Sequence, residues 1–356
     1  MSHRIENLRV NRFEPIISPA ELKARLPVND SVAGGIEDAR QSIVNVLTRK
    51  DPRLLLVVGP CSIHDPQAAL DYAERLLALR ERVKNQLLII MRVYFEKPRT
   101  TTGWKGLIND PHLEDSFAVS EGLEIARKLL LDIAEFGLPA GTEALDPIVP
   151  QYLQELISWT AIGARTSESQ THREMASGLS TPLGFKNATN GDLMVAINGM
   201  ISASTPHSFL GINAEGKGSI VHTTGNPHTH IVLRGGGGKM NYQAEDISAC
   251  EVALAKAGQP ANIMVDASHA NSNKDPAGQP LVMRNLCDQI AAGNRSIIGA
   301  MLESHIGWGN QPLQKPLKYG ISITDACIDW ATTEHLLLEC AERLAPALQD
   351  RIREAA

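Results

Sequence analysis

Short apolar segments alternate with longer amphipathic segments along most of the chain. The apolar segments have the length of buried strands. Two longer segments, Ala68–Glu81 and Gly122–Phe136, repeat Leu and Ala every three or four residues, which is typical of helices. Alternation of this kind predicts βαβ units and a parallel sheet. The candidate strands are Leu54–Val58, Leu87–Tyr94, Leu138–Ala144, Ala161–Arg165, Pro182–Asn187, Ser208–Ile212, Ser219–His222, His230–Arg234, Asn262–Ala267 and Ser296–Leu302.

Two of these strands, Ser208–Ile212 and Ser219–His222, are too close in sequence to be parallel neighbours. The segment between them, NAEGKG, suits a hairpin turn, whereas a parallel crossover needs a longer connection. Without this pair eight strands remain, the number in a (β/α)8 TIM barrel. We therefore predict an α/β protein with a (β/α)8 barrel over residues 46–350, an N-terminal extension over residues 1–45 and an inserted β-hairpin at about 208–223.

Composition narrows the classes of protein that fit. The chain has 356 residues, and 34 Lys and Arg against 40 Asp and Glu give a net charge of −6, so we expect no nucleic acid or anionic membrane partner. No segment has the roughly 18 apolar residues of a spanning helix, and Met1–Glu6 lacks the apolar run that follows the start of a signal peptide. Five scattered cysteines without metal-like pairs indicate a reducing compartment, and we predict a cytoplasmic protein.

A charged residue or a potential metal ligand ends or follows each of the eight predicted barrel strands. The carboxyl ends of barrel strands form the face that carries the active site in TIM-barrel enzymes. Four of these residues are cations, and several cations at one face predict a small-molecule substrate with more than one negative charge. Salt bridges to neighbouring carboxylates are the alternative for any single one of them. The four cations are Arg92, Arg165, Lys186 and Arg234.

A second group at the same face combines a thiol, an imidazole and carboxylates. Such a mixed set can bind one divalent transition metal ion. The group consists of Cys61, His269, Glu303 and Asp325. Because these residues lie far apart in sequence, spacing alone leaves other histidines open as ligands. The rival ligands are His64, His172, His228 and His230.

Several longer stretches resemble the type I, alpha-subtype family of 3-deoxy-D-arabino-heptulosonate 7-phosphate (DAHP) synthases. The likeness extends from about residue 5 to residue 340. It is carried by GPCSIHD (59–65), MRVYFEKPRTT (91–101), GWKGLINDP (103–111), GARTSES (163–169), GFKN (184–187), SHAN (268–271), ESH (303–305) and SITDAC (322–327). The resemblance implies a TIM barrel that condenses phosphoenolpyruvate with D-erythrose 4-phosphate and releases phosphate, the first step of the shikimate pathway.

The resemblance also implies roles for individual residues. One divalent ion per subunit, such as Mn²⁺, Fe²⁺, Co²⁺ or Zn²⁺, would be held by Cys61, His269, Glu303 and Asp325. Phosphoenolpyruvate would be bound through its phosphate by Arg165, Arg234 and the Ala164 backbone, and through its carboxylate by Arg92 and Lys186. Erythrose 4-phosphate would be bound by Lys97, Arg99 and Thr100. The candidate catalytic residues are Lys97, Glu143 and His172, and the sequence does not choose between Glu143 and His172 for proton transfer.

The resemblance implies a homo-oligomer, which we expect to be a homodimer or homotetramer, inhibited by an aromatic amino acid. The resemblance therefore implies an effector pocket near the hairpin and the N-terminal segment of a neighbouring subunit, for Tyr, Phe or Trp. Its residues here would be Pro150, Gln151, Gly178, Ser180, Phe209 and Val221. Three alternatives remain open: a related sugar-acid synthase that uses a five-carbon phosphate sugar, a metal-dependent aldolase without phosphoenolpyruvate, and a catalytically silent regulatory barrel.

Overall fold

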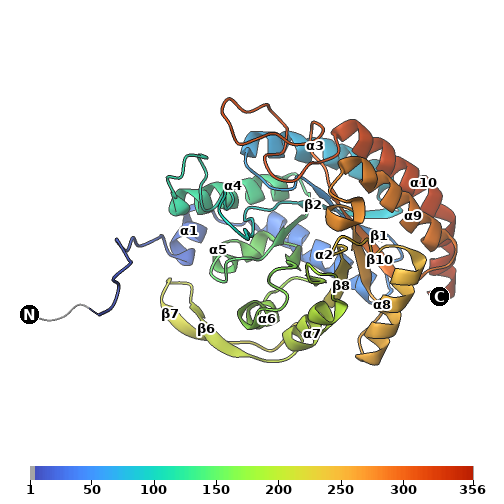
Figure 1. The fold of residues 1–356 in the computed structure, drawn as a ribbon, viewed down its shortest axis with the longest axis horizontal. Coiled ribbons are helices and arrows are strands. Elements are labelled where there is room, and N and C mark those ends of the chain that lie inside the picture. The colour runs from blue at the N-terminus through green and yellow to red at the C-terminus, as the bar shows by residue number, and fades with distance from the viewer. Residues whose placement is uncertain (1–4, 356) are drawn as a thin grey trace, which may run out of the picture.

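Eight parallel strands close into a barrel in the computed structural model, which describes residues 5–355 except for the side chains of residues 350 and 352–355. The strands follow the order β1-β10-β9-β8-β5-β4-β3-β2 around the barrel, with helices outside them (Figure 1). Their bounds are β1 Leu54–Gly59, β2 Leu87–Arg92, β3 Ala140–Glu143, β4 Trp159–Ile162, β5 Leu183–Lys186, β8 Thr229–Leu233, β9 Ile263–Asp266 and β10 Ile297–Glu303. The predicted (β/α)8 barrel is confirmed.

The helices lie between the strands and before the first one. Those before the barrel are α1 Pro19–Arg25 and α2 Asp30–Leu47. The others are α3 Pro66–Val83, α4 Val119–Glu135, α5 Pro150–Leu153, α6 Gln170–Ser177, α7 Leu193–Ala203, α8 Ala244–Lys256, α9 Gln279–Ala291 and α10 Trp330–Ala355. Residues 1–4 of the predicted extension lie outside the described residues. None of the helices in the described part of the chain is both long and apolar enough to span a membrane.

The apolar pattern of the strands explains which side of the barrel each residue faces. In β1 the alternate residues Leu55 and Val57 belong to the cluster inside the barrel, whereas Leu54, Leu56 and Val58 pack against the helices. Both faces are buried, which is why the strand reads as an unbroken apolar run.

One end of the barrel is closed by helix α2. Its residues Ile43, Val46 and Leu47 join the interior cluster, and the side chain of Asn262, just before β9, donates to the carbonyl of Leu47. The amino ends of the strands are therefore covered. The opposite face, at the carboxyl ends of the strands, is where the remaining chemistry is found.

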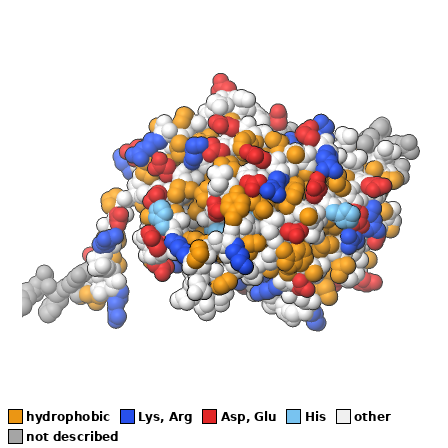
Figure 2. All heavy atoms as spheres, turned by 90° about the horizontal axis from the view of Figure 1, so that it is seen from above, with side chains coloured by type: hydrophobic (Ala, Val, Ile, Leu, Met, Phe, Trp, Pro, Cys, Tyr) orange, Lys and Arg blue, Asp and Glu red, His pale blue; other side chains and the backbone are white. Residues whose placement is uncertain are grey.

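The predicted hairpin is formed by β6 Ser208–Ile212 and β7 Gly218–His222, which pair antiparallel apart from the barrel. The backbone amide of Ala20 in α1 donates to the carbonyl of Ala214 in the hairpin turn, at 2.8 Å. The segment before the barrel is therefore bound directly to the insertion. On the face shown in Figure 2, acidic and basic side chains are interspersed rather than gathered by sign.

All ten predicted strands are present, but one was placed wrongly. The strand predicted over 161–165 is β4, which begins at Trp159 and ends at Ile162. The chain leaves the sheet at Gly163, whose carbonyl accepts hydrogen bonds from the amides of Thr166 and Ser167. Arg165 therefore lies in a turn beyond the strand, which frees its side chain from the barrel wall.

Candidate active site

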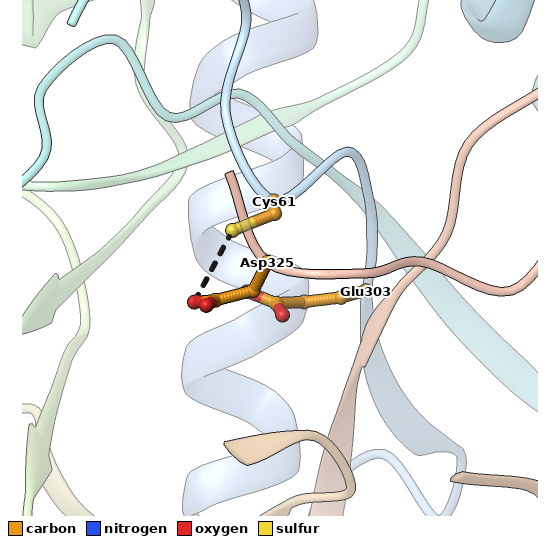
Figure 3. A group of neighbouring side chains, drawn as sticks. All are labelled: Cys61, Glu303 and Asp325. Atoms are coloured by element: carbon orange, nitrogen blue, oxygen red, sulfur yellow. Dashed lines mark hydrogen bonds between the residues drawn. The ribbon is translucent and has the colours of Figure 1, made fainter. Parts of the chain in front are cut away.

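Three predicted metal ligands meet at the carboxyl face of the barrel. Cys61 follows β1, Glu303 ends the adjacent strand β10, and Asp325 lies in the long loop before α10. Their ligand atoms all lie within 4.8 Å of one another. Figure 3 shows the three side chains lying together. A hydrogen bond of 2.7 Å between the hydroxyls of Ser62 and Thr324 brings the distant loop to β1. One sulfur and two carboxylates fit a divalent transition metal ion.

The thiol of Cys61 is fully buried in this cluster. Burial, together with the nearby Glu303 carboxylate, raises its pKa to about 11, so the metal-free thiol is protonated at neutral pH. The Lys97 ammonium donates a hydrogen bond to Cys61 Sγ at 3.0 Å. Lys97 therefore lies at the predicted metal site itself.

His269, the fourth predicted ligand, lies beside the cluster but outside the group of three. Its Nε2 is 4.0 Å from Glu303 Oε1, and its Nδ1 is 2.9 Å from Asp266 Oδ2. The backbone of His269 has φ of 55°, a left-handed conformation that is strained for a residue with a side chain. The Lys274 amide donates to the His269 carbonyl at 2.7 Å and helps to hold this turn.

Glu303 is held at both its backbone and its side chain. The Gln279 side chain accepts from the Glu303 amide and donates to its carbonyl, at 2.8 and 2.9 Å. The carboxylate accepts from Arg92 at 3.0 Å and from the Ser268 hydroxyl at 2.7 Å. Burial opposes its ionisation, but His269 and Arg92 outweigh burial and lower its pKa to about 2. The carboxylate is therefore ionised and fixed in place.

Two of the four predicted cations are buried and paired with carboxylates. Arg92 pairs with Glu303 at 3.0 Å, and its guanidinium lies 3.4 Å from the ring centre of Tyr94. Lys186, at the end of β5, pairs with Asp266 at 2.8 Å. For these two cations the salt-bridge alternative holds, although their place at the carboxyl face is as predicted.

The other two cations, Arg165 and Arg234, form no ion pair with a carboxylate within residues 5–355. Arg165 is exposed after β4 and donates to the Thr100 hydroxyl at 3.1 Å. Arg234 follows β8, and its amide donates to the Asn187 side chain. Ala164, the third predicted phosphate-binding residue, is half-buried beside Arg165. These uncompensated charges suit an anionic ligand.

Two cations of the loop after β2, Lys97 and Arg99, point in different directions. Lys97 reaches the Cys61 thiol, whereas Arg99 is exposed and donates to the Trp104 carbonyl at 2.8 Å. Thr100 is the contact between this loop and Arg165. The predicted sites for the two substrates therefore adjoin each other.

Comparison with known proteins identifies the family of this chain. The model of the DAHP synthetase I family matches residues 26–338. The chain belongs to this family. It is 53% identical over 351 residues to the Tyr-sensitive phospho-2-dehydro-3-deoxyheptonate aldolase of Escherichia coli K12, covering 98% of each chain. It is also 53% identical over 343 residues to the Phe-sensitive enzyme of that strain, covering 96% of this chain and 98% of the relative.

A solved structure shares the fold. The phospho-2-dehydro-3-deoxyheptonate aldolase of Francisella tularensis SCHU S4 superposes with a TM-score of 0.92 at 46% identity, covering 96% of this chain and 99% of the other. The resemblance inferred from the sequence motifs is confirmed.

One charged residue at this site, Asp266, is not among the residues predicted from the sequence. Asp266 ends β9, is fully buried and faces both Lys186 and His269. Burial works against its charge, but His269 and Lys186 prevail and hold the pKa of Asp266 well below its ordinary value. The signal in the sequence is an acidic residue within the otherwise apolar predicted strand Asn262–Ala267.

The two predicted candidates for proton transfer differ in their hydrogen bonds. Both ring nitrogens of His172 are engaged: Nε2 donates to the Leu145 carbonyl at 2.8 Å, and Nδ1 accepts from the Ser169 hydroxyl at 2.9 Å. Glu143, at the end of β3, has its Oε1 buried without a hydrogen-bond partner. A Cβ at Gly163 would lie 2.2 Å from that oxygen, so glycine at 163 leaves room for the carboxylate. Of these two side chains, only Glu143 therefore has an unpartnered polar atom within the described residues.

The predicted effector residues lie away from the metal cluster. Phe209 and Val221 are paired across the hairpin. Gly178 ends α6, where an added Cβ would lie 2.8 Å from the Thr223 side chain just after β7. Ser180 is exposed in the following turn. Pro150 and Gln151 begin α5, which packs against α1. Since α1 also contacts the hairpin turn, all six lie on elements linked to the segment before the barrel.

Proposed function

We propose that this protein is a DAHP synthase, which condenses phosphoenolpyruvate with D-erythrose 4-phosphate and water to give DAHP and phosphate. The observation that carries this proposal is the pair Arg165 and Arg234. Within residues 5–355 these two cations have no carboxylate partner, and they follow strands β4 and β8 at the same carboxyl face of the barrel as the Cys61–Glu303–Asp325 cluster. Family membership and the names of the relatives support the same reaction.

Substrate binding follows from the charges. Arg165, Arg234 and the Ala164 backbone would bind the phosphate of phosphoenolpyruvate, while Arg92 and Lys186 would bind its carboxylate. Because both of these cations already carry buried partners, they are held rigidly for this contact. The loop residues Lys97, Arg99 and Thr100 would bind erythrose 4-phosphate. Positioning two anions that otherwise repel each other is itself a large part of catalysis.

In the proposed reaction, C3 of phosphoenolpyruvate forms a bond to the aldehyde carbon, and the aldehyde oxygen gains a proton to become a hydroxyl. Water loses a proton as it adds at C2, and the bond from C2 to the phosphate oxygen breaks, so one proton is gained and one is lost. A divalent ion held by Cys61, His269, Glu303 and Asp325 would supply a Lewis acid for the aldehyde oxygen. Glu143, whose Oε1 lacks a hydrogen-bond partner, would accept the proton lost by the water.

The subsites can be separated by two substitutions. Arg165→Ala should raise the KM for phosphoenolpyruvate roughly 10- to 150-fold, because about 1.5–3 kcal/mol of charged hydrogen bonding is lost. Arg99→Ala should raise the KM for erythrose 4-phosphate instead. Steady-state kinetics with each substrate varied in turn tests this. Equal effects of either substitution on both substrates would contradict the assignment.

The four-carbon sugar distinguishes the proposal from the related five-carbon synthase and from an aldolase. Phosphate release should be fast with phosphoenolpyruvate and erythrose 4-phosphate and far slower with five-carbon aldose phosphates. An aldolase without phosphoenolpyruvate would release no phosphate in either mixture. A silent regulatory barrel would be inactive throughout.

Regulation and assembly belong to the same proposal. We expect a homodimer or homotetramer in the cytoplasm, for which the reduced state of all five buried cysteines is suitable. The effector would be an aromatic amino acid, as the names of the Tyr-sensitive and Phe-sensitive relatives suggest. Its pocket would include Pro150, Gln151, Gly178, Ser180, Phe209 and Val221, which combine apolar walls with a few polar groups.

Titration with Tyr, Phe and Trp should show inhibition by one of them at millimolar concentration or below. Ser180→Phe, which fills the proposed pocket, or deletion of residues 1–30 should relieve the inhibition while activity without effector remains. Inhibition that is unchanged in both variants would place the effector elsewhere.

A further inference from the structure

Glu96 is a buried carboxyl group with no role in the mechanism above. It lies just after β2, and only 4% of the residue is exposed. Its Oε2 accepts a hydrogen bond from the Asp146 amide, which is long at 3.5 Å. The next residue, Lys97, points to Cys61 and so does not neutralise it. Burying an ionised carboxylate without a cation is costly, so something else must stabilise Glu96 in this position.

Glu96 and Glu143 both line one small cavity. Its volume is about 20 Å³, enough for one water molecule. Apart from these two carboxyl groups the walls are mainly apolar, with Phe95, Ile108 and Leu153 among them. The buried Oε1 of Glu143 has no hydrogen-bond partner. A protonated carboxyl group at Glu96 could donate to the unpartnered Oε1 of Glu143, whereas two ionised carboxylates could share only a water that donates to both.

The electrostatics favour Glu96 as the carboxyl group that carries a proton. Burial raises the pKa of Glu96 to about 8, and the negative charges of Asp146 and Glu143 add to this effect. The backbone amide of Asp146 acts in the opposite direction but is outweighed. At neutral pH Glu96 is therefore mostly a neutral acid and a hydrogen-bond donor.

We propose that Glu96 is a positioning residue that stays protonated and donates a hydrogen bond to the Glu143 carboxylate, directly or through one water in the shared cavity. This hydrogen bond fixes the orientation of Glu143 as the acceptor of the proton lost by the attacking water. The proton of Glu96 is shared and not consumed, so the balance of the reaction is unchanged. This inference rests on the proposed function, because it assigns Glu143 that role.

The inference predicts a specific pH dependence of kcat. When Glu96 loses its proton, near pH 8, the donor becomes a second negative charge beside Glu143. Wild-type kcat should therefore fall as the pH rises above about 8. In Glu96→Gln the amide is a permanent neutral donor, so kcat at pH 7 should stay within about threefold of wild type and the alkaline fall should disappear.

Three further variants make the test sharp. Glu96→Ala should lower kcat at least about tenfold at pH 7, with less change in either KM. Asp146→Asn removes a negative charge beside Glu96, so the alkaline fall should move to lower pH. Glu114→Gln, at an exposed position on the same connection between β2 and α4, should leave the profile unchanged. Thermal unfolding of each variant checks that it folds.

A second readout does not depend on activity. Infrared spectra of the wild type at pH 7 should show the carbonyl stretch of a protonated carboxylic acid that disappears on raising the pH and is missing in Glu96→Gln. An unchanged alkaline fall in Glu96→Gln, or the absence of that band, would overturn the inference while leaving the proposed reaction intact. If the wild type released no phosphate from the two substrates, the proposed function itself would fail.

Discussion

Replacing Cys61 by Ala is expected to remove metal binding and nearly all activity while the barrel remains folded. The thiol supplies one of the three clustered ligand atoms, and its loss leaves two carboxylates and the neighbouring His269 imidazole, which bind a transition metal ion less tightly than the complete set. Because Lewis-acid assistance is worth several kcal/mol, kcat should fall roughly a thousandfold or more. Metal content by atomic absorption and phosphate release should fall together.

Cys250→Ala is the matched control for this prediction. Cys250 is also a free, fully buried cysteine, but it lies in α8 away from the cluster. Its replacement should leave metal content and kcat unchanged and reduce stability only by the loss of one buried sulfur. Normal activity of Cys61→Ala would exclude Cys61 as a necessary ligand.

Asp266→Ala is expected to destabilise the protein by about 3–5 kcal/mol, because the Lys186 ammonium would remain buried without a partner. Activity should also fall, since Asp266 faces His269 and holds Lys186 at the proposed carboxylate site. Denaturant unfolding of the wild type and the variant measures the difference. Asp288→Ala is the control, because its pair with Arg343 is at the surface and is worth at most about 1 kcal/mol. A loss below 1 kcal/mol for Asp266→Ala would contradict this account of the pair.

The sequence predicted the barrel well because both faces of its strands are buried. Most of the strands, β1, β2 and β10 most clearly, therefore appear as runs of apolar residues, and the side chain that ends the run marks the carboxyl face. The error at β4 has a local cause, since Gly163 starts a turn that the apolar pattern does not reveal. The hairpin was found from its short connection alone.

The pairing of charges could not be predicted in the same way. Arg92 and Glu303, or Lys186 and Asp266, come from strands far apart in sequence, and only closure of the barrel brings them together. The choice of Glu143 over His172 likewise depends on hydrogen bonds that no sequence pattern shows. The motif resemblance named the candidate ligands and substrate contacts. The structure shows how these residues lie relative to one another, which the sequence does not.

The central claim is that the cations and the Cys61 cluster at the carboxyl face together carry out a metal-dependent condensation. The most direct measurement is phosphate release by the purified protein with both substrates, with each substrate alone, and with both after treatment with a chelator. We predict rapid release only with both substrates, loss of release after chelation, and recovery when Mn²⁺ or a similar ion is added. Full activity in the metal-free protein, or no release with both substrates and metal, would contradict the account.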